Sequence, residues 1–188
     1  MKNPSAWIGQ ASATPLKRMQ LPPPPAGYRE RMPTFAEEPR LAMAGKDAFG
    51  REVRLAEEAA SAWTAMSEAA ESGGVRLLLL SGFRSISRQA DIVRKKLDAG
   101  VPLEVILRVN AYPGFSEHHT GRAIDLGSPD CEHFSESFDT TREFGWLREH
   151  AAQFGFSLSY PRDNSSGITY EPWHWYLSKK APIRSARS

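Results

Sequence analysis

The sequence predicts an α+β domain in which helices pack on a small, mainly antiparallel sheet. Two features of the pattern predict this class. Apolar residues recur at helical spacing in separate stretches, and short apolar runs bounded by turn residues indicate strands, most of them in the second half of the chain. The order of these elements indicates a sheet formed largely by the later strands. The length of 188 residues suits one domain with a sizeable core.

A proline-rich segment precedes the predicted domain. Pro22–Pro25 removes four consecutive backbone donors and favours polyproline II. We therefore expect residues 1–45 to form an irregular N-terminal arm, residues 46–180 to form a single domain, and residues 181–188 to form a C-terminal tail.

The longest helical pattern runs from Arg51 to Ala70. Its apolar residues recur at spacings of three and four, which predicts one buried stripe, and Gly73-Gly74 ends the helix. Val75–Leu80 is a short apolar run after this stop and predicts a buried strand. The stripe comprises Val53, Ala56, Ala60, Trp63, Met66 and Ala70.

Capping and turn residues predict the remaining elements. Ser85 or Ser87 caps a second helix that ends near Ala99, and Pro102 starts a short helix over residues 103–109. Downstream we expect a loop over 110–120 and a strand over 121–126. A helix follows, capped by Asp139, Thr140 or Thr141 and ending at Gln153. The last expected elements are a strand over 156–160, a turn over 163–167, and a strand over 168–177 that Pro172 interrupts.

Composition excludes several classes of protein. The net charge of +2 comes from 24 basic and 22 acidic side chains, which gives no reason to expect nucleic acid as a partner. No apolar run is long enough for a signal peptide or a membrane span. We expect a monomer that is cytoplasmic as the chain stands, or located in the cell envelope if a signal has been removed. The single cysteine, Cys131, excludes an internal disulfide.

Two clusters carry residues suited to metal chemistry. The first runs from Ser116 to Asp125 and contains His118, and the second runs from Glu171 to Tyr176 and contains His174. Two histidines and one aspartate offer the three protein ligands of a catalytic zinc site and leave a fourth position for water. We expect one zinc ion per chain at a site that draws its ligands from both clusters.

Glu171 is the candidate general base for a water at this site. It precedes His174 by three residues, and odd spacing on a regular strand places two side chains on opposite faces. Both reach one site only if Pro172 or a bulge turns the backbone between them. The sequence therefore predicts a local irregularity over Glu171–Trp173.

The two clusters together resemble a known signature. Ser-x-His-x-x-Gly-x-Ala-x-Asp followed by Glu-x-Trp-His resembles the LAS zinc metallopeptidases, in particular their D-alanyl-D-alanine carboxypeptidase and dipeptidase branch (peptidase M15, VanY-like). Ser81-Gly82-Phe83-Arg84-Ser85 with Gln89, and the downstream Glu143-Phe144, Gly155-Phe156 and Ser159-Tyr160-Pro161, are similar to the same branch. The resemblance covers residues 45–178 and implies a hedgehog/D,D-peptidase-like fold with the zinc site in a cleft.

The resemblance also implies roles for individual residues. His118, Asp125 and His174 would bind the zinc ion. Glu171 would activate the attacking water and later protonate the leaving amine. Arg84 would face the developing oxyanion. Ser116 and Gln89 would contact the substrate, at its terminal carboxylate or a nearby amide.

The implied reaction is hydrolysis near the C-terminus of peptidoglycan stem peptides or their precursors, with D-Ala-D-Ala ends as the leading substrate. An L,D-carboxypeptidase or a peptidoglycan endopeptidase would use the same site. A non-catalytic zinc-containing binding module, as in hedgehog, is the alternative from another class. Such a module is expected to lose the base or the oxyanion donor, so the presence of Glu171 and Arg84 favours an enzyme.

Overall fold

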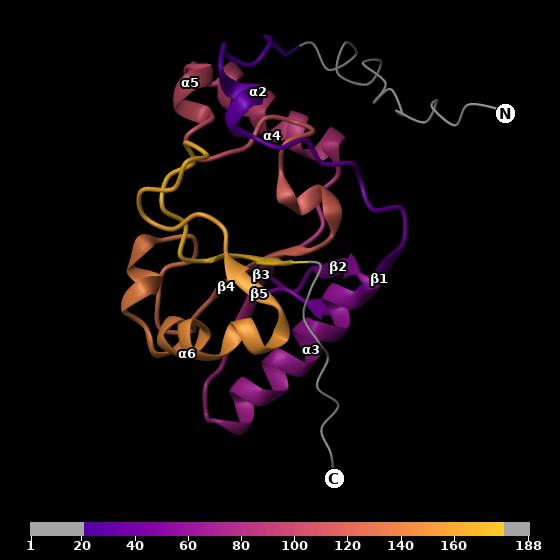
Figure 1. Ribbon diagram of the computed structural model, residues 1–188, viewed down its shortest axis with the longest axis vertical. Coiled ribbons are helices and arrows are strands. Elements are labelled where there is room, and N and C mark those ends of the chain that lie inside the picture. The colour runs from indigo at the N-terminus through magenta and orange to yellow at the C-terminus, as the bar shows by residue number, and fades with distance from the viewer. Residues whose placement is uncertain (1–20, 179–188) are drawn as a thin grey trace, which may run out of the picture.

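A computed structural model describes residues 21–178 of the chain (Figure 1). Its centre is a four-stranded antiparallel sheet in the order β3-β4-β6-β5. The predicted α+β class, with helices on a small antiparallel sheet, is confirmed. The strands are β3 (Leu78–Ser81), β4 (Ala123–Gly127), β5 (Phe156–Leu158) and β6 (His174–Leu177).

The main core lies between this sheet and the helices α3 (Glu57–Ser72) and α6 (Arg142–His150), which lie below the sheet in Figure 1. Because strand side chains alternate between faces, Ile124 and Trp175 enter this core while their neighbours Asp125 and His174 face the other way. One face of the sheet therefore packs against the main core, and the other face carries the polar groups Asp125 and His174.

A second, smaller core lies on the other side of the sheet. It joins α2 (Tyr28–Arg31) and the end of α5 (Leu103–Ile106) to the loops that follow, and α4 (Ile86–Asp98) contacts α5 (Figure 1). The Tyr28 hydroxyl accepts a hydrogen bond from Tyr112 N at 2.8 Å, which ties α2 to this group. The buried members are Tyr28, Met32, Leu107, Ala111, Tyr112, Phe115, Tyr160 and Ile168.

The expectation of an irregular arm over residues 1–45 is wrong for two stretches within residues 21–45. Tyr28 anchors α2 because its ring is buried in the second core. β1 (Leu41–Lys46) forms a hairpin with β2 (Glu52–Ala56), so the chain is already regular before the expected boundary. Residues 1–20 of the arm and the expected tail at 181–188 lie outside the described residues.

The helix expected from Arg51 begins instead at Glu57, because residues 52–56 form β2. Val53 and Leu55 are buried while Glu52 and Arg54 are exposed, which is the alternation of a strand. Val53 and Ala56 fit a helical stripe as well, so spacing alone could not separate the two. All six residues of the predicted stripe are buried.

The cap predictions agree with the structure. Ser85 accepts a hydrogen bond from Arg88 N at the start of α4, and Thr141 accepts one from Phe144 N at the start of α6. The expected loop over 110–120 contains the 3₁₀ turn η1 (Glu117–Thr120). Further 3₁₀ turns flank α6, namely η2 (Glu136–Thr140) and η3 (Ala151–Phe154).

The last predicted strand is shorter than expected, because β6 begins only at His174. The backbone turns just before it, and His174 N donates to Glu171 O at 3.1 Å. The predicted irregularity over Glu171–Trp173 is therefore present. Across residues 21–178, no helix has both the length and the apolar character needed to cross a membrane.

Gly121 joins η1 to β4 and offers a test of this fold. Its φ is +64°, and an added Cβ would lie 2.7 Å from Ala56 N, a backbone atom. We expect Gly121→Ala to lower the free energy of unfolding by about 2 kcal/mol or more, because the left-handed backbone and the clash both oppose a side chain. Denaturant unfolding measures this change.

Gly145→Ala is the matched control. Gly145 lies inside α6, and an added Cβ would meet nothing within 4 Å. Alanine favours a helix more than glycine by roughly 0.5–1 kcal/mol, so this variant should be as stable as the original protein or more stable. Equal destabilisation of both variants would contradict the role assigned to Gly121.

Candidate active site

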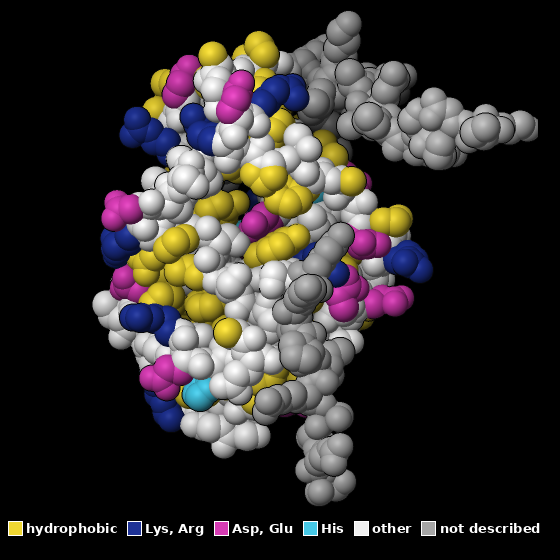
Figure 2. All heavy atoms as spheres, viewed as in Figure 1, with side chains coloured by type: hydrophobic (Ala, Val, Ile, Leu, Met, Phe, Trp, Pro, Cys, Tyr) yellow, Lys and Arg dark blue, Asp and Glu magenta, His cyan; other side chains and the backbone are white. Residues whose placement is uncertain are grey.

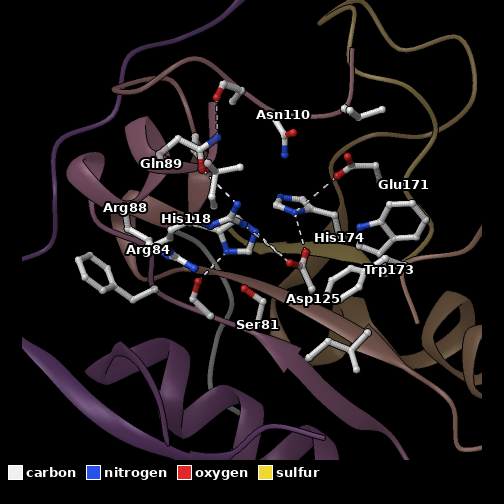
Figure 3. Close-up of a pocket in the computed structure, with 18 of the residues that line it drawn as sticks. Ser81, Arg84, Arg88, Gln89, Asn110, His118, Asp125, Glu171, Trp173 and His174 are labelled. Atoms are coloured by element: carbon white, nitrogen blue, oxygen red, sulfur yellow. Dashed lines mark hydrogen bonds and ion pairs between the residues drawn. The ribbon is translucent and has the colours of Figure 1, made fainter. Parts of the chain in front are cut away.

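The candidate site lies in a cleft of about 700 Å³ between the polar face of the central sheet and α4. Figure 2 shows one face of the molecule hollowed at mid-height, with acidic and apolar side chains around the opening. In the close-up, Arg84 and Gln89 lie on one side of the cavity and Glu171 and Trp173 on the other (Figure 3).

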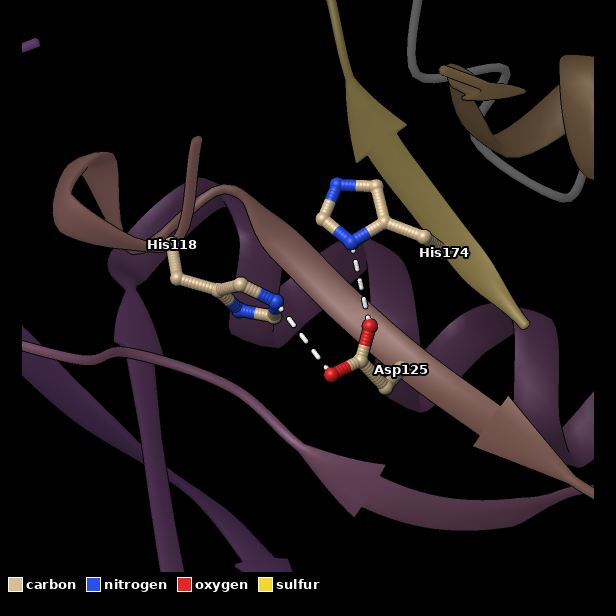
Figure 4. A group of neighbouring side chains, drawn as sticks. All are labelled: His118, Asp125 and His174. Carbon is tan, nitrogen blue, oxygen red and sulfur yellow. Dashed lines mark hydrogen bonds and ion pairs between the residues drawn. The ribbon is translucent and has the colours of Figure 1, made fainter. Parts of the chain in front are cut away.

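Three buried side chains meet at the floor of the cleft (Figure 4). The antiparallel pairing of β4 with β6 places Asp125 directly opposite His174, and η1 brings His118 to the same point. Asp125 Oδ1 lies 3.0 Å from His174 Nδ1, and Asp125 Oδ2 lies 3.2 Å from His118 Nε2. The three expected metal ligands are therefore brought together.

The second nitrogen of each imidazole is already engaged. His118 Nδ1 donates to Gly82 O at 2.7 Å, which leaves Nε2 with a lone pair directed at the cluster. His174 Nε2 lies 2.9 Å from Glu117 Oε2, which leaves Nδ1 for the same purpose. Carboxylate and carbonyl partners of this kind set the orientation of histidine ligands around metals.

The donor set fits zinc. Two imidazole nitrogens and one carboxylate oxygen are the ligand types of a catalytic zinc site. The candidate atoms all lie within 4.8 Å of one another. Neighbouring ligands of a tetrahedral site with bonds of about 2.1 Å are separated by roughly 3.4 Å, so only small side-chain movements are needed to close on an ion.

The charges around this cluster favour a cation at its centre. Burial opposes protonation of His174, but hydrogen bonds and charge attraction from Asp125 and Glu117 raise the pKa of His174 to about 10. Burial lowers the pKa of His118 to about 4 against the attraction of Asp125. The two histidines hold the pKa of Asp125 well below its usual value, although burial alone would raise it. A bound cation would take over the charge that the His174 proton carries.

Glu171 is directed at this cluster despite its spacing from His174. The turn before β6 brings Glu171 Oε2 to 4.0 Å from His174 Nδ1. Burial, with a smaller contribution from the charge of Asp125, raises the pKa of Glu171 to about 7. A carboxylate with a pKa near neutrality can both accept and return a proton.

Arg84 lies on the opposite side of the cluster, with Nη2 4.0 Å from Asp125 Oδ2. Gln89 positions it, because Gln89 Oε1 accepts from Arg84 Nη1 at 3.1 Å and Gln89 Nε2 donates to Ala111 O at 2.6 Å. Gln89 is 1% exposed, so its amide serves these contacts first. Its expected contact with substrate, and that of the buried cleft residue Ser116, remain predictions.

Comparison with known proteins assigns the family. Residues 52–179 match the VanY family, described as D-alanyl-D-alanine carboxypeptidase. The chain belongs to this family. It is 38% identical over 132 residues to YodJ of Bacillus subtilis (strain 168), a match that covers 68% of this chain and 48% of YodJ. The chain thus spans about half or less of the curated relatives it matches, down to 37%.

Solved structures agree with the VanY assignment. The LdcB LD-carboxypeptidase has a TM-score of 0.69 at 32% identity, covering 77% of this chain and 71% of that one. A variant of the vancomycin resistance D,D-pentapeptidase VanY in complex with Zn(II) has a TM-score of 0.58 at 25% identity, covering 83% of each chain. The expected D,D-peptidase-like fold is confirmed, and a Zn(II) complex within the same fold agrees with the donor set.

Sequence reasoning missed Glu117. Its side chain is 16% exposed, and its carboxylate contacts His174 Nε2 on the side away from Asp125. The available signal was its position next to His118 in the first cluster, but nothing in the sequence paired it with a residue 57 positions later. Glu117 completes a carboxylate–histidine pair of the kind found behind metal ligands.

We expect Glu117→Ala to weaken zinc binding by about 10–100-fold, because His174 would lose the partner that fixes its ring. Glu117→Gln keeps an oxygen acceptor for His174 Nε2, so it should lose less zinc affinity than Glu117→Ala. Competition with a chromophoric chelator measures the affinity.

Glu149→Ala is the control, since that side chain is 78% exposed and lies on α6. Unchanged zinc affinity in Glu117→Ala would show that Glu117 does not orient His174.

Proposed function

We propose that this VanY-family chain is a zinc-dependent carboxypeptidase that acts on peptidoglycan stem peptides, with D-Ala-D-Ala ends as the leading substrate. One observation carries the proposal. The buried set of His118, Asp125 and His174 lies between a base, Glu171, and a cation, Arg84, in one cleft. The family description, D-alanyl-D-alanine carboxypeptidase, supports the substrate class.

When bound, zinc would polarise the scissile carbonyl and lower the pKa of an adjacent water. Glu171 is positioned to accept the proton of the attacking water and to deliver it to the leaving amine. Arg84 stabilises the negative charge that develops on the carbonyl oxygen, and Gln89 keeps its guanidinium aimed at the cleft. The floor of the cleft is buried, which limits access of bulk water. The lower local dielectric strengthens both the polarisation by zinc and the charge stabilisation by Arg84.

An L,D-carboxypeptidase is the second candidate. LdcB, an LD-carboxypeptidase, matches at 32% identity, against 25% for the D,D-pentapeptidase VanY. Both chemistries require the same ligands, base and cation, so the walls of the cleft determine which peptide bond is cleaved.

The general-base role has a direct test. We expect Glu171→Gln to retain zinc, since Glu171 is not one of the three ligands, and to lose turnover by about 10²–10⁴-fold. Metal analysis should give one zinc per chain in both proteins. A variant that keeps its turnover would remove Glu171 from this role.

Product analysis separates the candidate reactions. We expect the zinc-loaded protein to release free D-alanine from a pentapeptide ending in D-Ala-D-Ala, and mass spectrometry of the products identifies the bond. Release of D-alanine only from tetrapeptides would identify an L,D-carboxypeptidase, and internal fragments would identify an endopeptidase. Zinc binding without cleavage of any stem peptide would favour the binding module.

A further inference from the structure

Helix α4 presents a row of side chains to the cleft. Arg88, Ile92 and Lys96 are spaced by four residues, so they lie on one side of the helix, and all three line the cavity. Each step along the row covers about 6 Å. Two cations therefore extend along the cleft wall beyond Arg84, and the catalytic sequence described above uses neither.

Lys96 and Asn110 form a hydrogen-bonded pair in this wall. Lys96 Nζ donates to Asn110 Oδ1. A lysine has donors only, so the amide oxygen of Asn110 must face it, and the NH₂ group of Asn110 is left as a donor. Figure 3 shows the Asn110 side chain projecting into the cavity. No acceptor within residues 21–178 hydrogen-bonds to that NH₂ group.

The charge of this pair is not neutralised locally. Within the described part of the chain, no carboxylate lies within ion-pair distance of Lys96 or Arg88. Lys96 is half-buried, and burial lowers its pKa while the charge of Glu171 opposes that effect. Lys96 is therefore a partly desolvated cation near the catalytic base, with a neutral donor beside it.

We propose that Lys96 and Asn110 form a carboxylate-binding subsite of the cleft, which recognises a carboxylate of the substrate peptide near the scissile bond. The hydrogen bond between them holds the ammonium of Lys96 and the NH₂ group of Asn110 next to each other, and a carboxylate can accept hydrogen bonds from both donors. This inference rests on the proposed function, since it assigns a recognition element to that substrate class.

Two carboxylates of a stem peptide have this chemistry. One is the C-terminal carboxylate of the leaving residue, and the other is the side-chain carboxylate of a diaminopimelate residue before the cleaved bond. Stem peptides that contain lysine in place of diaminopimelate carry an ammonium group there, which Lys96 and Arg88 of the protein would repel. Either source makes the subsite a determinant of substrate specificity.

Binding to zinc-loaded protein in the Glu171→Gln background tests the subsite without turnover. Three pentapeptides are titrated by calorimetry, all with D-isoglutamine so that no third carboxylate is present. One carries free terminal and diaminopimelate carboxylates, one has an amidated C-terminus, and one has amidated diaminopimelate. We expect Lys96→Met to weaken binding of the first peptide by about 10–100-fold, the range for a hydrogen bond to a charged group.

The two amidated peptides identify the carboxylate. The peptide whose amide replaces the recognised carboxylate should bind weakly to the protein that retains Lys96. Lys96→Met should not weaken the binding of that peptide any further. The other amidated peptide keeps the recognised carboxylate, so Lys96→Met should weaken its binding as much as that of the first peptide. Asn110→Asp, which exchanges the donor for a carboxylate, should reproduce this pattern.

Lys95→Met is the matched control, because Lys95 is exposed on the same helix and lies outside the cleft lining. It should change binding by less than about twofold. Equal loss for all three peptides in Lys96→Met, or no loss for any, would overturn the subsite.

The subsite and the proposed function fail in different ways. Cleavage of stem peptides by the original protein, with binding that is indifferent to Lys96, would remove only the subsite. Binding that depends on Lys96 and on one carboxylate, without cleavage of any peptide, would remove only the peptidase.

Discussion

The antiparallel pairing of β4 with β6 is the constraint on which the rest of the site depends. It places Asp125 opposite His174, and the same register directs Ile124 and Trp175 into the core on the other face. A one-residue slip would exchange the two faces and turn Asp125 and His174 into the core. Core packing and site geometry are therefore determined by the same set of backbone hydrogen bonds.

A buried carboxylate between two imidazoles needs further support, because isolated charges are costly in an interior. Gly82 O and the carboxylate of Glu117 supply it by engaging the outer nitrogen of each histidine. The cluster therefore consists of three inner groups and two outer ones. The same contacts would orient both rings toward a cation.

Two separate cores support the cleft from its two sides. The main core supports the floor through α3 and α6, and the smaller core supports the loops that carry Ala111 and Tyr160. Gln89 connects the two parts, because it hydrogen-bonds both Arg84 and Ala111.

The sequence by itself predicted the fold class, a short choice of helix caps that includes Ser85 and Thr141, and three side chains that the structure brings together as a possible metal site, because these depend on local spacing and residue chemistry. It also predicted the turn before His174 from a conflict in spacing. Only the tertiary structure decided that residues 52–56 form a strand, since Val53 and Ala56 suit either periodicity until β1 pairs with them. It likewise decided the contact of Glu117 with His174 and the pairing of Lys96 with Asn110, because long-range contacts have no periodic signal in one sequence.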